Sequence, residues 1–288
     1  MEEENVRGEK IKALIGITRP VNWLIAGIGV IAGCLAGVGL NPTFASSILL
    51  AFFSTVLMMA GGNSLDYLDR NIDAVVRGRR SFPPGKLHPS TAFHFAVVSF
   101  IVGIILAFFI NLECFIIALF NLLIIIAYEI SLKKRGFVGN VATGYLVGSV
   151  FWFGGASVGE IFVIEIIFMA VLAGLVSIGR EILKDILGIV GDKGVRETLP
   201  MRIGKKNARI ISASFIGLAT VLSFFTLFWG ILGESKYTYV FLAVPNALFI
   251  VISVLLISRC NALEVSSKLL KAGMVIALIP FILGGVLR

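Results

Sequence analysis

The sequence predicts an all-α membrane protein that crosses the bilayer many times. Hydrophobic residues make up 58% of the 288 residues, and only 15% are charged; the mean hydropathy is +0.98. A soluble domain carries about a quarter charged residues, so this chain has too few polar side chains to cover a soluble core of its size. Its apolar runs are continuous and of membrane length, which excludes the alternating pattern of a β-barrel.

Nine such runs follow one another, and we expect each to form one transmembrane helix. The predicted spans are about 20–40, 44–64, 90–110, 114–132, 137–156, 161–180, 207–231, 239–258 and 266–286. Two polar segments, 66–89 and 181–206, are predicted to form cap loops over one end of the bundle. Residues 1–288 are therefore expected to form a single transmembrane domain.

Several local signals refine the elements in chain order. Residues 1–16 are predicted to form an amphipathic lead-in at the membrane interface, and Pro20 suits the first turn of the first span, where its missing amide donor has no partner. The charged N-terminus argues against a cleaved signal peptide. Pro245 and Pro280 are expected to kink the last two spans. The three cysteines match no metal or disulfide spacing and are expected to be packing residues.

The distribution of basic residues predicts the orientation. With nine spans and a cytoplasmic N-terminus, 23 of the 25 Lys and Arg residues fall on the cytoplasmic side, and only Lys236 and Arg288 fall outside. The net charge of +8 thus has a topological explanation, and we expect no nucleic-acid partner. The protein is predicted to lie in the cell membrane, with its C-terminus outside.

Two acidic stretches end the second and sixth spans at the predicted cytoplasmic face. Their polar residues are spaced as on one helix face, at i, i+3 and i+7 in the first stretch. We expect a bundle in which the two stretches face each other over one cavity. The candidate catalytic carboxylates are Asp66, Asp69, Asp73, Asp185 and Asp192.

Clustered carboxylates at neutral pH need a cation, and oxygen ligands from carboxylates and an amide suit Mg²⁺. The candidate metal ligands are Asn63, Asp66, Asp69, Asp73, Asp185 and Asp192. Basic neighbours would bind the phosphate oxygens of the same substrate. The candidates for that role are Arg80, Lys86, Lys133, Arg180 and Lys184. Together with an apolar cavity wall, this pattern predicts a diphosphate on a lipid tail.

Two other interpretations remain open at this point. Charged residues at helix ends are often solvated interface residues without chemistry. A transporter or channel with a carboxylate-lined pathway is a second class, but it would place acids at mid-membrane depth. The span interiors are nearly free of acids, with Glu165 the closest exception.

The two stretches also resemble the paired signatures of the UbiA superfamily of intramembrane prenyltransferases. The first is DYLDRNID (66–73) with RSFPPG (80–85), and the second is REILKD (180–185) with GD (191–192) and TLP (198–200). RPVNW (19–23) and GN (139–140) fit as well. The resemblance covers essentially the whole chain.

This resemblance implies nine helices around a central cavity that opens laterally to lipid. It implies transfer of a prenyl group from an allylic diphosphate, with two Mg²⁺ held by the aspartates, through an allylic cation that a dry, aromatic cavity protects. The further cavity residues it suggests are Asn22, Tyr67, Tyr128, Asn140 and Tyr145. The chain departs from the family pattern at Leu65, where an Asn is usual, and at Gly188, where an Asp is usual.

The acceptor is the least determined part of the prediction. The second signature is most similar to the digeranylgeranylglyceryl phosphate synthase branch, which implies a geranylgeranyl donor and geranylgeranylglyceryl phosphate as acceptor in membrane ether-lipid synthesis. The alternative is an aromatic acceptor of a quinone, haem or chlorophyll-type pathway. The two cap loops are expected to close over the cavity mouth as lids.

Overall fold

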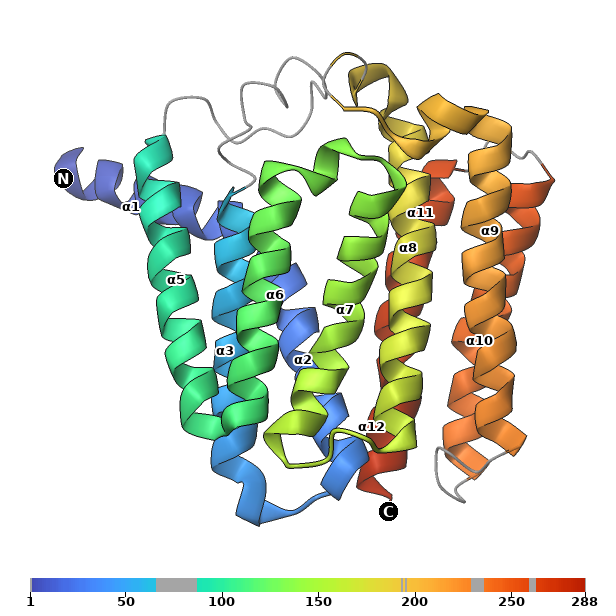
Figure 1. The fold of residues 1–288 in the computed structure, drawn as a ribbon, viewed down its shortest axis with the longest axis horizontal. Helices are drawn as coiled ribbons and strands as arrows, with labels where there is room; N and C mark the ends of the chain where they lie inside the picture. The colour runs from blue at the N-terminus through green and yellow to red at the C-terminus, as the bar shows by residue number, and fades with distance from the viewer. Residues whose placement is uncertain are drawn as a thin grey trace.

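The computed structural model describes residues 2–65, 87–192, 194, 196–228, 236–258 and 263–287. Within these ranges the regular structure is entirely helical, and the long helices form one bundle (Figure 1). The α-helices are α1 Glu2–Thr18, α2 Pro20–Val38, α3 Ala45–Leu65, α5 Pro89–Ile110, α6 Leu112–Ile130, α7 Phe137–Ser157, α8 Ile164–Asp192, α9 Leu199–Phe228, α10 Lys236–Ile257, α11 Leu263–Ile276 and α12 Leu278–Val286.

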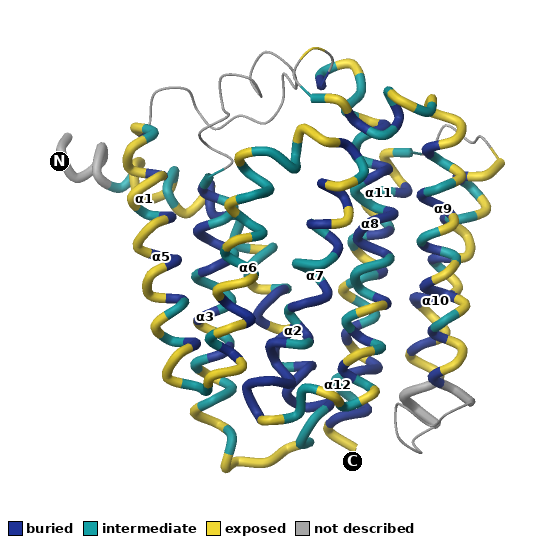
Figure 2. Tube along the Cα trace, viewed as in Figure 1, coloured by how far each residue is buried: buried dark blue, intermediate teal, exposed yellow. Residues whose placement is uncertain are grey.

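The predicted membrane class is confirmed. In the described part of the chain, nine helical segments are long and apolar enough to span a bilayer, with α11 and α12 together forming the ninth. Each overlaps one predicted span. Large apolar side chains on the outer helix faces are exposed (Figure 2), as expected for surfaces that contact lipid. Helix α1 lies across the end of the bundle at which α2 begins (Figure 1).

The largest difference from the prediction concerns the segment 181–206, which was expected to be a cap loop. Helix α8 continues to Asp192 and α9 already begins at Leu199. The helix persists because its apolar stripe persists, and Ile182, Leu183 and Ile186 are buried. Gly188 and Gly191 therefore do not unwind it. The first part of α9 turns at Gly204, whose φ of 83° is one that glycine tolerates.

The helix of the ninth span is interrupted close to Pro280, as the sequence predicts. Helices α11 and α12 meet at Ala277, three residues before Pro280. Proline removes one amide donor and its ring clashes with the carbonyl four residues earlier, which here belongs to Ile276, the last residue of α11. The kink expected from Pro280 is thus confirmed. Pro245 lies inside α10.

Glycines bring α2 and α7 into close contact at the centre of the bundle. A Cβ atom on Gly154 would clash with the backbone carbonyl of Val30, and one on Gly33 would clash with that of Phe151. Helices without side chains at the contact approach closely, which gains packing energy in a bilayer. Cys34 donates its thiol to the carbonyl oxygen of Gly154 at 3.2 Å, which adds a polar contact at the same place. The contact between α2 and α7 fixes one wall of the cavity described below.

We predict that Gly154→Ala destabilises the bundle by about 1–3 kcal/mol, because the new methyl group forces α2 and α7 apart. The measurement is thermal unfolding in detergent. Gly217→Ala is the matched control, since a Cβ at Gly217 of α9 meets nothing within 4 Å and alanine favours a helix over glycine by about 1 kcal/mol. Equal stability of the two variants would contradict the close-packing account.

Candidate active site

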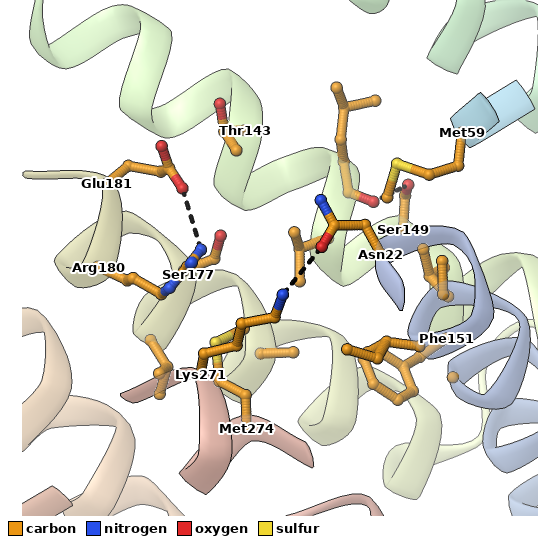
Figure 3. A pocket seen from close by; sticks show the side chains of 18 of the residues that line it. Asn22, Met59, Thr143, Ser149, Phe151, Ser177, Arg180, Glu181, Lys271 and Met274 are labelled. Atoms are coloured by element: carbon orange, nitrogen blue, oxygen red, sulfur yellow. Dashed lines mark hydrogen bonds and ion pairs between the residues drawn. The ribbon is translucent and has the colours of Figure 1, made fainter. Parts of the chain in front are cut away.

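A cavity of about 790 Å³ opens inside the bundle. Helices α2, α3 and α6 to α12 contribute to its wall, so that residues far apart in sequence meet there. Figure 3 shows side chains from α2, α3, α7, α8 and α11 pointing into it. The cavity contains both charged groups and a large apolar surface, a combination suited to a substrate with an ionic head and a hydrocarbon tail.

The charged groups of the cavity are more often basic than acidic. Among the described residues, six basic side chains and three acidic side chains line it. The basic residues are Arg19, Lys133, Arg180, Lys184, Arg196 and Lys271; the acidic residues are Glu129, Glu181 and Asp185. Charged side chains are rare inside membrane bundles and usually mark a functional site.

Asp185 is placed by α8 against α7. Its Oδ2 atom accepts a hydrogen bond from Nδ2 of Asn140 at 3.0 Å, and Asn140 itself is buried. Asn140 belongs to the first turn of α7, where the turn at Gly136 brings the chain back into the bundle with a φ of 58°. The amide fixes the carboxylate in one orientation, and the structure gives no described partner for its second oxygen, Oδ1.

Two of the basic side chains pair with carboxylates three or four residues earlier in the chain. Lys133 contacts Glu129 at 2.5 Å on the α6 side. Lys184 donates to both oxygens of Glu181, at 2.8 and 2.6 Å, on α8. Nη1 of Arg180 makes a longer contact with the same carboxylate, at 3.4 Å, and its Nε atom is buried without a hydrogen-bond partner in the described structure. This arrangement leaves donors on Arg180 available to an anion in the cavity.

Arg19 occupies an unusual backbone position at the corner between α1 and α2. Its φ is 54°, the only positive φ of a non-glycine residue in the described part of the chain. Such conformations cost energy and are concentrated at functional sites. The corner is held by Asn63, whose Nδ2 donates to the carbonyl oxygen of Thr18 at 2.9 Å, and by Trp23, whose Nε1 donates to Oγ1 of Thr18 at 3.2 Å.

The remainder of the cavity is largely apolar. Aromatic and aliphatic side chains from α7, α8, α10 and α12 form it, among them Phe151, Leu172, Phe249 and Phe281. A hydrogen-bonded pair lies in the same wall, in which Oγ of Ser223 donates to Oδ1 of Asn246 at 2.8 Å. This surface can hold a long hydrocarbon chain and exclude water from a reacting centre.

The structure brings together many of the residues predicted from sequence. Those that line the cavity are Asn22, Asn63, Tyr128, Lys133, Asn140, Arg180, Lys184 and Asp185. Six other predicted site residues lie outside the described residues: Asp66, Tyr67, Asp69, Asp73, Arg80 and Lys86.

Two predicted residues are described but do not line the cavity. Tyr145 packs edge to face against Phe120 of α6, with ring centroids 5.6 Å apart. Asp192 is buried at the end of α8. Because α8 stays helical between Asp185 and Asp192, the two carboxylates are separated by two turns, about 10 Å along the axis. Whether both carboxylates bind metal stays a prediction.

Sequence reasoning missed several cavity residues, and Lys271 is the most informative of them. It was counted only among the basic residues that set the orientation, although it falls inside the predicted span 266–286. A lysine within an apolar span is itself a signal of function. Glu181 and Arg196 were also missed, as was the cavity position of Arg19.

The described residues contain no group of three metal-ligating side chains. Asp185 contributes one carboxylate, and most of the other predicted ligands lie in the segment that is not described. A hard oxygen donor, oriented by an amide and facing a cavity, has the chemistry that Mg²⁺ requires. The described residues thus fit one side of a divalent-metal site.

Comparison with known proteins decides the family. Residues 26–279 match the UbiA prenyltransferase family. The chain belongs to the UbiA prenyltransferase family. It is therefore an enzyme that transfers prenyl groups.

Relatives within the UbiA family cover nearly the whole chain. A digeranylgeranylglyceryl phosphate synthase from Methanococcoides burtonii is 38% identical over 95% of this chain and 100% of the relative. The enzyme of the same name from Thermococcus kodakarensis is 36% identical over 97% and 100%. A solved digeranylgeranylglyceryl phosphate synthase structure has a TM-score of 0.78 and 32% identity, covering 97% of this chain and 100% of that one.

More distant UbiA structures share the fold. A homologue from Archaeoglobus fulgidus bound to DMAPP and Mg²⁺ has a TM-score of 0.69 at 17% identity, covering 93% of this chain and 98% of that one. The predicted all-α fold and family resemblance are thereby confirmed.

We predict that Asn140→Ala raises the Mg²⁺ concentration needed for half-maximal activity by roughly tenfold, since partners that orient a ligating group typically contribute 10–100-fold. The measurement is prenyl transfer against Mg²⁺ concentration. Thr143→Ala is the control, because Thr143 lines the same wall but its hydroxyl donates to the carbonyl of Gly139 in its own helix. An unchanged Mg²⁺ requirement in Asn140→Ala would contradict a positioning role for Asn140.

Proposed function

We propose that the protein transfers a geranylgeranyl group from geranylgeranyl diphosphate to geranylgeranylglyceryl phosphate in ether-lipid synthesis. The observation that carries this proposal is the cavity itself, in which the oriented Asp185 carboxylate and a basic excess lie next to a long apolar wall. Whole-length similarity to digeranylgeranylglyceryl phosphate synthases supports the choice of acceptor.

In the proposed reaction, the bond between the allylic carbon C1 and the diphosphate oxygen breaks and the electron pair leaves with the diphosphate. A hydroxyl oxygen of the acceptor forms the new bond to C1 and its proton is lost to solvent. Arg180, Lys184 and Lys133 lie where they can stabilise the negative charge that develops on the leaving group. The apolar wall keeps water from the allylic cation.

Asp185, oriented by Asn140, would hold Mg²⁺ together with oxygen ligands from the acidic stretch at 66–73. Bound Mg²⁺ supplies positive charge to the diphosphate oxygens and so assists their departure. The number of Mg²⁺ ions stays a prediction, and the paired signatures imply two. The A. fulgidus structures with Mg²⁺ and DMAPP or GPP support the use of a divalent metal by this fold.

The orientation is part of the proposal. The end of the bundle at which α8 ends carries most of the basic residues and is assigned to the cytoplasm, as the positive-inside rule requires. The active site then opens on the cytoplasmic side, where water-soluble metal ions reach the diphosphate.

We predict that purified protein converts labelled geranylgeranyl diphosphate with geranylgeranylglyceryl phosphate in the presence of Mg²⁺, and that EDTA abolishes the reaction. Each acceptor is supplied alone, and the labelled product is identified by chromatography. Product with 4-hydroxybenzoate but not with the glyceryl phosphate would overturn the proposed acceptor in favour of the aromatic alternative. Flux across vesicles without any covalent product would favour a transporter.

We also predict that Asp185→Asn lowers turnover by at least about a hundredfold, because the variant keeps the shape of the side chain but loses the charge that binds metal. The measurement is the initial rate at saturating substrates. Glu197→Gln is the control: Glu197 has a side chain 64% exposed and pairs with Arg202 outside the cavity. Wild-type turnover by Asp185→Asn would contradict the metal-binding role of Asp185.

A further inference from the structure

Lys271 presents a positive charge to the cavity from a wall different from that of Asp185. It belongs to α11, eight residues from the start of that helix at Leu263, or about 12 Å along its axis. Its Nζ atom donates to Oδ1 of Asn22 on α2 at 3.1 Å, and both residues line the cavity. Figure 3 shows the two side chains meeting across the cavity, with Arg180 on α8 beside them.

The environment of Lys271 contains cations but no described carboxylate partner. The Asn22 amide is neutral, and within the described residues the charges that act on Lys271 are the positive ones of Arg180, Lys184 and Arg19. Lysine has three donors, and the structure uses one of them. A cation placed among cations inside an apolar bundle is costly unless an anion joins them.

Arg180 adds a second donor set at the same place. Its Nε atom is buried and has no hydrogen-bond partner in the described structure, and its only described ion pair, with Glu181, is long at 3.4 Å. Arg180 lines the same cavity as Lys271, and its remaining guanidinium donors add to the positive charge that an anion at Lys271 would meet.

We propose that Lys271, Asn22 and Arg180 form a second anion subsite that binds the phosphate monoester of the acceptor. This inference rests on the proposed function and deepens it. The subsite has no described carboxylate beside Lys271, whereas a metal-bound diphosphate needs carboxylates around it, as at Asp185. Arg180 of α8 would then lie between the two anionic heads, with the donor diphosphate toward Asp185 and the acceptor phosphate toward Lys271 of α11 and Asn22 of α2.

The apolar surroundings fit the rest of such an acceptor. Met274, one turn further along α11, and Phe151 of α7 line the same cavity as Lys271, and Figure 3 shows all three side chains. A phosphate at Lys271 would thus leave the attached hydrocarbon chain against apolar side chains. An aromatic acid is smaller and has no such chain, so it would contact fewer of these apolar side chains.

The test compares Lys271→Met with Lys268→Met in steady-state kinetics. Lys268 is on the same helix, is exposed and does not line the cavity, so the two variants share the same chemical change. We expect Lys271→Met to raise KM for geranylgeranylglyceryl phosphate by roughly tenfold or more, since a hydrogen bond to a charged group contributes about that factor. KM for geranylgeranyl diphosphate should stay within about twofold, and Lys268→Met should resemble the wild type.

A second arm removes the phosphate from the acceptor in place of the lysine. With geranylgeranylglycerol as acceptor, the wild type should have about the same high acceptor KM as Lys271→Met has for geranylgeranylglyceryl phosphate. The KM of Lys271→Met should not rise further when the phosphate is removed from the acceptor. Lys271→Arg should recover most of the affinity for the phosphate-bearing acceptor.

The outcomes separate this inference from the proposed function. No product from the wild type with geranylgeranylglyceryl phosphate would overturn the proposed function itself. Wild-type turnover combined with an unchanged acceptor KM in Lys271→Met would overturn only the subsite. A raised KM for geranylgeranyl diphosphate in Lys271→Met would also overturn it, because Lys271 would then serve the donor.

Discussion

The need to compensate charge inside an apolar bundle is the constraint on which this structure depends. The helices turn large apolar side chains outward and retain an inward cavity in which basic side chains outnumber acidic ones among the described residues. Isolated charges in such surroundings are unfavourable. Some are neutralised locally, as in Lys133–Glu129 and Lys184–Glu181. Others, above all Lys271 and Arg180, are left with unused hydrogen-bond donors, and we propose that anionic substrates accept hydrogen bonds from them.

The bundle is built to keep this arrangement rigid. Glycines bring α2 and α7 into backbone contact, and Asn63 and Trp23 hold the corner at which Arg19 enters the cavity. Asn140 and Asn22 perform related tasks, since each amide orients one charged group, a carboxylate in one case and an ammonium in the other. Because an amide is neutral, it orients a charged group without neutralising the charge that binds the substrate or the metal. Such preorganisation lowers the cost of binding and of reaching the transition state.

Sequence predicted the fold well because membrane length and hydropathy are local properties. The nine spans and the break near Pro280 follow from runs of apolar residues and from the missing donor of proline. The cap loop predicted at 181–206 is much shorter in the structure, because the buried stripe of Ile182, Leu183 and Ile186 keeps α8 helical as far as Asp192. Asp185 and Asn140 were predicted separately as site residues, and the structure shows that they are hydrogen-bonded to each other. Lys271 was missed because only the packing of α11 against α8 and α10 reveals that it faces the cavity.

The central claim is that the Asp185 wall binds a divalent metal together with the donor diphosphate. The most direct measurement is anomalous diffraction from crystals grown with Mn²⁺ and an unreactive thiodiphosphate analogue of geranylgeranyl diphosphate. The account predicts a Mn²⁺ peak at coordinating distance from the Oδ1 atom of Asp185, the oxygen not bonded to Asn140, with the thiodiphosphate between that ion and Arg180. A peak only at other sites, with Asp185 uncoordinated, would contradict the account.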